Sequence, residues 1–200
     1  MQMTDGPLNR FYYSFDWGPI HFLSYSSEHP FNKGSEQWNF IANDLEKASK
    51  RRDLTPWIIV WSHRPLYCTD LLVWQGRCVD EANVYRRNIE GLLHEYGVDL
   101  HTSGHNHQYE RSYPVYNGTA NHNFHNANAT VYIVNGAAGD IEGIDPTFLP
   151  ENPGYRAFAQ PTVHTGYGRM TVNHTALTWD YVDADTMKVV DTMTLTKTKQ

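Results

Sequence analysis

Residues 57–61 (WIIVW) and 98–102 (VDLHT) enclose one helical pattern, and this stretch decides the fold. WIIVW is wholly apolar, which is typical of a strand that is covered on both faces of a parallel sheet. From about residue 82 to 96 the apolar residues fall on one helical face, and Gly97 follows where helices commonly end. The order strand, helix, strand predicts a right-handed βαβ unit, in which the carboxyl ends of both strands meet at one edge of the sheet.

The remaining sequence predicts more strands than helices. Residues 11–25 are typical of two short aromatic strands around a turn, and a helix is expected from Ser35, its N-cap. The stretch 140–166, rich in proline and glycine, is expected to be a long loop. Further strands are predicted near residues 109–116, 131–135, 168–174, 177–182 and 188–195. We therefore predict one α/β unit with a βαβ core at about 57–108 and a β-rich closing part at about 109–196.

Composition excludes several classes of protein. With 40% hydrophobic and 19% charged residues, the 200-residue chain is expected to fold as one domain. The formal net charge of −6 and the absence of a basic stripe argue against nucleic acid as a partner. No apolar run reaches 18 residues, so no membrane span is expected, and the first ten residues do not resemble a signal peptide.

Cysteines and glycosylation triplets bear on the compartment. Cys68 and Cys78 are either two buried thiols or a disulfide, and two cysteines are too few for a zinc cage of the CxxC type. Asn117, Asn128 and Asn173 each begin an N-x-[ST] triplet, which favours a secreted glycoprotein with a disulfide. Secretion then requires a signal peptide upstream of Met1.

Histidines follow both strands of the βαβ unit. His63 comes directly after WIIVW in the loop SHRP, and His105 and His107 come after VDLHT in the loop SGHNH. Ligands of open α/β sheets bind outside the carboxyl ends of the strands, so these rings are expected to converge. In an extended turn, residues i and i+2 point to one side about 6.5 to 7 Å apart. That spacing suits two metal ions about 3.5 to 4 Å apart, so the sequence predicts a two-metal site.

Most histidines receive no such role, and the oxygen ligands of the site are not apparent. Two hard or trivalent ions need carboxylates, but the nearby acids show no paired metal spacing; they are Asp70, Asp99, Glu110, Asp140 and Glu142. The histidines expected to be surface or core residues are His21, His29, His94, His101, His122, His125, His164 and His174.

Several motifs, in order along the chain, resemble the C-terminal half of a purple acid phosphatase, a member of the calcineurin-like metallophosphoesterases. They are FYYSFDWGPIHFLSYSSE (11–28), GSEQW (34–38), TPWIIV (55–60), SHRPLYC (62–68), SGHNHQYERSYPVYNGT (103–119) and VYIVNGAAG (131–139). The resemblance implies a sandwich of two mixed β-sheets flanked by helices, of which this chain holds only the C-terminal part. It also implies that Cys68 and Cys78 form a loop disulfide.

The resemblance further implies a dinuclear centre and its chemistry. His63 and His105 would bind the divalent ion, which is Zn, Mn or Fe(II), and His107 would bind Fe(III). A phosphomonoester substrate would bridge the metals, and hydroxide activated by them would attack phosphorus in line. The implied activity is that of an acid phosphatase in the secreted fraction or in the endolysosomal or vacuolar lumen.

The chain departs from the family where the other ligands should be. The motifs GDxG, GDxxY and GNHE do not occur, so the carboxylate and tyrosine ligands are expected in a missing N-terminal half of the catalytic domain. Residues 70–74 (DLLVW) lack the extra substrate-site histidines of some plant members, which leaves the proton donor unassigned, with His164 one candidate. We expect little activity from the chain alone. A non-catalytic glycoprotein and a phosphatase of diesters or nucleotides stay open as alternatives, as does the oligomeric state.

Overall fold

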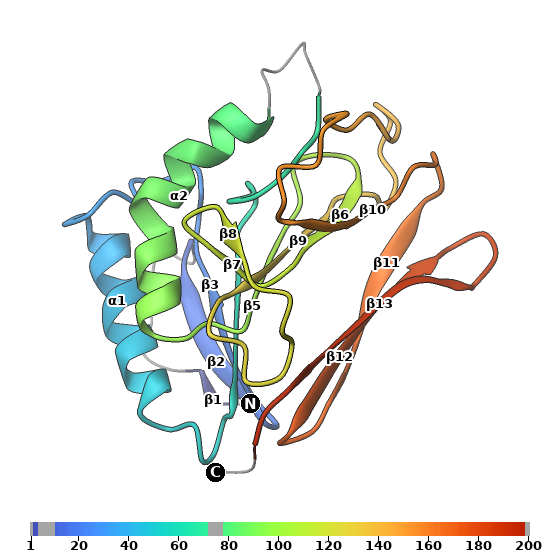
Figure 1. Cartoon of the computed structure of the whole chain (residues 1–200). Coiled ribbons are helices and arrows are strands. Elements are labelled where there is room, and N and C mark those ends of the chain that lie inside the picture. Colours follow the sequence, from blue (N-terminus) through green and yellow to red (C-terminus); the bar gives the residue numbers. More distant parts are fainter. Residues whose placement is uncertain (1, 4–10, 72–77, 199–200) are drawn as a thin grey trace.

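A large sheet with helices on one face and a small sheet on the other organises the structure, a computed structural model that describes residues 2–3, 11–71 and 78–198 (Figure 1). The large sheet is mixed and has eight strands in the order β1-β2-β3-β4-β5-β9-β6-β10. Its first three strands are β1 (Gln2–Met3), β2 (Tyr13–Trp17) and β3 (Ile20–Ser24). The small sheet has three antiparallel strands, β11 (Gly166–Val172), β12 (Ala176–Asp183) and β13 (Val189–Thr196).

The βαβ unit is present as predicted. Strands β4 (Trp57–Trp61) and β5 (Leu100–Ser103) pair in parallel, with Ile59 opposite Leu100, and the helix α2 (Cys78–Glu95) joins them. Helix α2 begins four residues earlier than its apolar pattern indicated. Its first turn contains Asp80 and Glu81, which favour a helix N-terminus electrostatically but add nothing to an apolar pattern.

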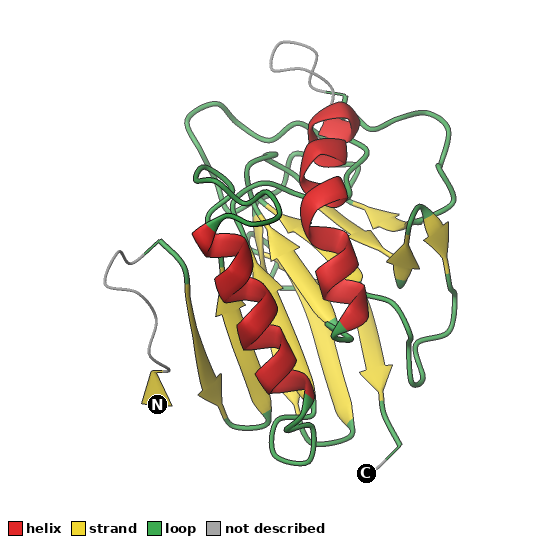
Figure 2. Ribbon diagram, turned by 90° about the vertical axis from the view of Figure 1, so that its left-hand side faces the viewer, coloured by secondary structure: helices red, strands yellow, loops and turns green. Residues whose placement is uncertain are grey.

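Helix α1 (Glu36–Ser49) follows the predicted N-cap. The hydroxyl of Ser35 accepts a hydrogen bond from the Trp38 backbone N–H, and the apolar stripe with Ile41 and Leu45 is buried against the sheet. Both helices lie on the same face of the large sheet (Figure 2). Among the described residues, neither helix has the length and apolar composition that crossing a bilayer requires.

The β-rich part differs from the prediction in three places. The expected strand 109–116 is divided into β6 (Tyr109–Ser112) and β7 (Val115–Tyr116), because Pro114 cannot donate to a ladder. The expected loop 140–166 contains β10 (Arg156–Ala159), which pairs antiparallel with β6. As a short, half-buried edge strand, β10 lacks the alternation by which strands are recognised. A further short strand that was not predicted, β8 (Thr119–Ala120), pairs antiparallel with β7, and β9 (Val131–Asn135) is present as predicted.

The two sheets are joined by packing and by a buried ion pair. The rings of Tyr109 and Tyr181 stack with centroids 3.7 Å apart, one from each sheet. Asp191 on β13 accepts hydrogen bonds of 2.7 and 2.8 Å from the Arg111 guanidinium and one of 2.8 Å from the Tyr109 hydroxyl. With sheets packed on each other and helices outside, the predicted fold class is confirmed.

Candidate metal centre

His63 and His105 lie side by side at the carboxyl edge of the parallel strands. The loop after β4 and the loop after β5 are tied by two backbone hydrogen bonds, from Ser62 N–H to the Thr102 carbonyl and from Gly104 N–H to the His63 carbonyl. Nδ1 of His105 is 3.2 Å from Nε2 of His63. The parallel register therefore brings together two histidines that are 42 residues apart.

The backbone of His105 is in a conformation that few residues adopt. Its φ of +64° is left-handed, which costs free energy for a residue with a Cβ and is often found at functional sites. Hydrogen bonds from Asn106 N–H to the Gly104 carbonyl and from Gln108 N–H to the Asn106 carbonyl curl the loop. The extended turn expected from the sequence is therefore wrong, and the loop presents His105 and His107 from a tight bend.

The electrostatics of His105 favour the form of histidine that binds metals. Burial lowers the pKa of His105 to about 4, and the electrostatic influence of neighbouring Arg64 and His63 acts in the same direction. The ring is therefore neutral well below physiological pH. Neutral imidazole is the ligand form.

The facing nitrogens fit one divalent ion. Nitrogens that each lie about 2.0–2.1 Å from a tetrahedral ion are roughly 3.3 Å apart, close to the spacing of His63 Nε2 and His105 Nδ1. Two imidazoles suit zinc and other borderline ions. The residues present fit the divalent half of the implied centre, and their role as ligands stays a prediction.

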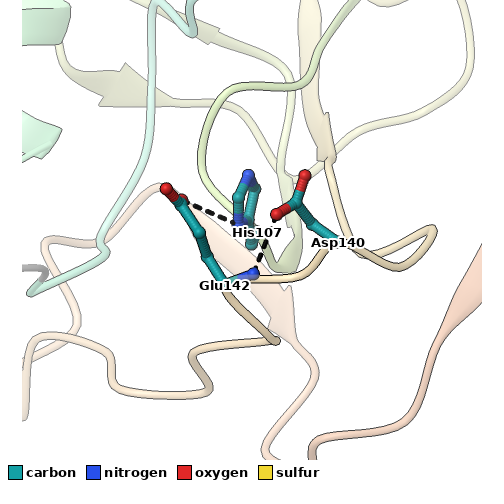
Figure 3. Close-up of side chains that lie close together, drawn as sticks. All are labelled: His107, Asp140 and Glu142. Atoms are coloured by element: carbon teal, nitrogen blue, oxygen red, sulfur yellow. Dashed lines mark hydrogen bonds and ion pairs between the residues drawn. The ribbon is translucent and has the colours of Figure 1, made fainter.

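His107 lies with two carboxylates that follow β9. Figure 3 shows the ring between the side chains of Asp140 and Glu142, which point toward it. Nδ1 of His107 is 3.8 Å from Oε2 of Glu142, and the Glu142 N–H donates to the Asp140 carboxylate over 2.9 Å. One ligand atom from each of the three residues lies within 4.8 Å of the others. Sequence reasoning named both acids but did not connect the D-x-E spacing with His107.

Asn106 lies between the two histidines in the sequence and holds their loop through a buried hydrogen bond. Its buried side-chain amide donates a hydrogen bond of 2.6 Å to the carboxylate of Asp70. Asp70 lies two residues after Cys68, and Cys68 is bonded to Cys78, so the disulfide that the resemblance implies is present in the structure. The disulfide thus connects the segment that holds Asn106 to the first residue of α2.

The first glycine of the NGAAG motif makes room for the histidine loop. A Cβ on Gly136 would lie 2.0 Å from the Asn106 carbonyl oxygen, so only glycine lets the segment after β9 pass this close. Gly136 also donates a backbone hydrogen bond of 3.0 Å to the Gln108 carbonyl. This close approach explains why the first glycine of the motif is needed.

Arg64 and Glu81 both contact Nε2 of His105, the ring nitrogen that faces away from His63. No sequence pattern indicated a role for Glu81. Nη1 of Arg64 is 3.3 Å from Nε2 of His105 and forms an ion pair with Glu81. Oε2 of Glu81 is 3.4 Å from the same His105 nitrogen. Nε of Arg64 donates to Glu28 over 2.7 Å.

The remaining acids and His164 lie elsewhere. Glu110 accepts hydrogen bonds from Thr69, and burial raises its pKa to about 7. Asp99 pairs with Arg52 and Lys197 at the opposite edge of the sheet. Nδ1 of His164 is 3.3 Å from Asp185. Residues 72–74 of the stretch without extra histidines lie outside the described residues.

Two of the histidines expected to have no role are buried. His101 is 1% exposed on β5, and burial lowers its pKa to about 3. His21 on β3 is 2% exposed and lies between Asp16 and Asp44 at 2.7 and 2.8 Å. Both belong to the interior of the sheet region.

Two family models match the chain. Residues 4–109 match the calcineurin-like phosphoesterases, and residues 129–192 match the iron/zinc purple acid phosphatase-like protein C. An acid phosphatase of Aspergillus ficuum is 32% identical, over 96% of this chain and 38% of that protein. Acid phosphatase type 7 of Danio rerio is 34% identical, over 97% of this chain and 48% of that protein.

A comparison with solved structures finds the same family. A purple acid phosphatase from seeds of yellow lupin (Lupinus luteus) superimposes with a TM-score of 0.82 and 30% identity, over 94% of this chain and 33% of the other. The sheets and these matches place the chain in the calcineurin-like phosphoesterase family. Within that family the chain belongs to the purple acid phosphatases. It spans between a third and a half of the length of these relatives.

Proposed function

We propose that this chain is the histidine-bearing half of an acid phosphatase that hydrolyses phosphomonoesters at a two-metal centre. The carrying observation is the approach of His63 and His105 to 3.2 Å at the ends of neighbouring parallel strands. Their loops contain the motifs that resemble the family.

Each histidine has a separate task in this proposal. His63 and His105 hold a divalent ion, Zn, Mn or Fe(II), between their facing nitrogens, and His107 holds Fe(III). When bound, the two ions would polarise the phosphoryl oxygens and lower the pKa of a water molecule enough to supply a nucleophile. The residues of this chain orient the ions: the curled loop fixes His105 and His107, and Asn106 holds that loop.

The oxygen ligands come, in this proposal, from the N-terminal half of a complete catalytic domain. An aromatic surface supports it, formed by Tyr13, Phe15, Phe22 and Trp61 on the helix-free face of β2, β3 and β4. Phe22 adjoins the core between the sheets, and all four rings are only half-buried. Among the described residues, the small sheet does not bury these four rings completely. A further part of the second sheet would cover them.

Secretion or delivery to an acidic lumen is part of the proposal. Asn117, Asn128 and Asn173 are all exposed, as acceptors of N-linked glycans must be. Disulfides such as Cys68–Cys78 persist in oxidising compartments. Removal of glycans from the natural protein by an endoglycosidase should lower its apparent mass.

The test uses the longest natural form of the protein. His105→Ala should lower the turnover of p-nitrophenyl phosphate at least 100-fold and lower the bound metal by elemental analysis. The control His125→Ala removes an exposed histidine that contacts Thr196, and should change neither.

Two results would contradict the proposal. If His105→Ala keeps full activity and metal, the histidines are not ligands. If the natural protein holds no metal and hydrolyses no phosphomonoester, it is instead a non-catalytic glycoprotein. One relative, from Arabidopsis thaliana, is named probable inactive purple acid phosphatase 9, so this outcome is worth testing. Faster turnover of diesters than monoesters would identify the other alternative.

A further inference from the structure

We propose that Glu81 is a positioning residue for the metal centre: its carboxylate keeps the proton of His105 on Nε2 and leaves Nδ1 free to bind the ion. The inference rests on the proposed function, because the ion is implied by the family. It concerns a residue outside the histidine motifs, on the first turn of α2.

The two nitrogens of His105 face different groups. Nδ1 lies 3.2 Å from Nε2 of His63, so Nδ1 is the atom that can share an ion with His63. A neutral imidazole binds a metal through its unprotonated nitrogen, so the proton must then be on Nε2. Nε2 lies 3.4 Å from Oε2 of Glu81, within ion-pair range, so a small turn of the ring or of the carboxylate would let Glu81 accept that proton's hydrogen bond. Carboxylates behind ligand histidines commonly fix the tautomer in this way.

Arg64 competes for the same nitrogen. Its Nη1 is 3.3 Å from His105 Nε2, and because a guanidinium only donates, this contact favours the opposite tautomer. However, Arg64 already has two carboxylate partners, Glu28 at 2.7 Å and Glu81. In this proposal the two carboxylates balance the charge of Arg64, so Glu81 rather than Arg64 sets the tautomer of His105, with or without an ion at Nδ1.

The position of Glu81 is set by rigid structure. Helix α2 begins at Cys78, whose disulfide to Cys68 fixes the start of the helix. A carboxylate in the first turn also interacts favourably with the helix dipole. The side chain of Glu81 is 32% exposed, so water competes for its hydrogen bonds and the effect on metal affinity should be moderate.

The direct test measures the tautomer in the metal-free chain. Long-range ¹H–¹⁵N correlation spectra at pH 8, where a histidine of ordinary pKa is neutral, distinguish Nε2–H from Nδ1–H. We expect Nε2–H for His105 in the unaltered chain, and a shift toward Nδ1–H in Glu81→Ala. Glu81→Gln should keep Nε2–H, because its amide oxygen still accepts. Glu81→Leu replaces the alanine variant if that variant does not fold.

Glu28→Ala is the matched control, because it removes a carboxylate from the other side of Arg64 without touching His105. It should leave the tautomer unchanged. In calorimetric titrations with Zn²⁺, Glu81→Ala should bind about 10-fold more weakly than the unaltered chain, and Glu28→Ala within about threefold of it.

The proposal is overturned if the unaltered chain shows Nδ1–H, or if Glu81→Ala leaves the tautomer as it was. It is also overturned if Glu28→Ala weakens Zn²⁺ binding as much as Glu81→Ala, because the cause would then be net charge. The spectra need neither metal nor substrate, so this failure is distinguishable from a failure of the phosphatase proposal.

Discussion

The side-chain amide of Asn106 donates a hydrogen bond of 2.6 Å to the carboxylate of Asp70, and both side chains are buried. This contact connects the histidine loop to the disulfide-linked segment. Asn106, between His105 and His107, therefore has a structural role that the metal-binding motif alone does not indicate.

Asn106→Ala should therefore damage both stability and the metal centre. Losing the amide removes a hydrogen bond to a buried carboxylate, which costs about 1.5 to 3 kcal/mol in the free energy of unfolding. Urea unfolding measures this loss, and Zn²⁺ titration measures the accompanying fall in affinity. Asn43→Ala, on the exposed side of α1, is the control and should change stability by less than about 0.5 kcal/mol. Equal stability of both variants would show that the contact contributes nothing.

Gly136→Ala should displace the histidine loop. The new Cβ would meet the Asn106 carbonyl oxygen at 2.0 Å, and backbone must move to relieve this clash. We expect a loss of roughly 1 to 3 kcal/mol, as for overpacking in a core, together with weaker Zn²⁺ binding. Gly91→Ala, in helix α2 with open space around its Cα, should instead stabilise the chain by about 0.5–1 kcal/mol. A Gly136→Ala chain with unchanged urea midpoint and Zn²⁺ affinity would contradict the account of the NGAAG motif.

The two carboxylates that contact buried His21, Asp16 and Asp44, make stability depend on pH. Burial alone would lower the pKa of His21, but the hydrogen bonds and charges of Asp44 and Asp16 outweigh it and raise the pKa above its ordinary value. A raised pKa means that protonated His21 stabilises the fold fully below pH 6.5 and that this contribution is lost as pH rises through the folded-state pKa. The pKa of Asp16 is lowered: burial opposes this, but His21 and Arg51 prevail, so its own contribution is lost only in acid.

His21→Gln should consequently cost more free energy of unfolding at pH 6 than at pH 8.5. At pH 6 the loss should be about 1.5 to 3 kcal/mol, as for hydrogen bonds to a charged group. Urea unfolding of both chains at the two pH values gives the comparison, since other titrating groups affect both chains alike. A difference that is constant with pH would mean that folding leaves the pKa of His21 unchanged, which would contradict the raised pKa.

The sequence allowed contacts to be predicted where the order and pairing of strands alone bring two residues together. Parallel pairing of WIIVW with VDLHT was enough to bring His63 to His105, because both loops leave the same edge of the sheet. Glu81 could not be found in this way, because its contact with His105 depends on where α2 begins and how the disulfide orients it. Asp140 and Glu142 reach His107 only because Gly136 lets their segment pass close to the histidine loop, and a sequence pattern does not reveal such a contact.

The 200-residue chain alone should bind one Zn²⁺ ion weakly and hydrolyse p-nitrophenyl phosphate no faster than buffer with the same metal. Glu142 lies 3.8 Å from His107, and Glu81 contacts the His105 nitrogen that faces away from His63. Neither contact places a carboxylate between an ion on His63 and His105 and an ion on His107, where a bridging ligand is needed to offset the charge of the two ions. Phosphate release, measured with and without added Zn²⁺, Mn²⁺ or Fe²⁺, tests this, with the longest natural form of the protein as the positive control. Robust metal-dependent hydrolysis by the chain alone would mean that it contains a complete centre.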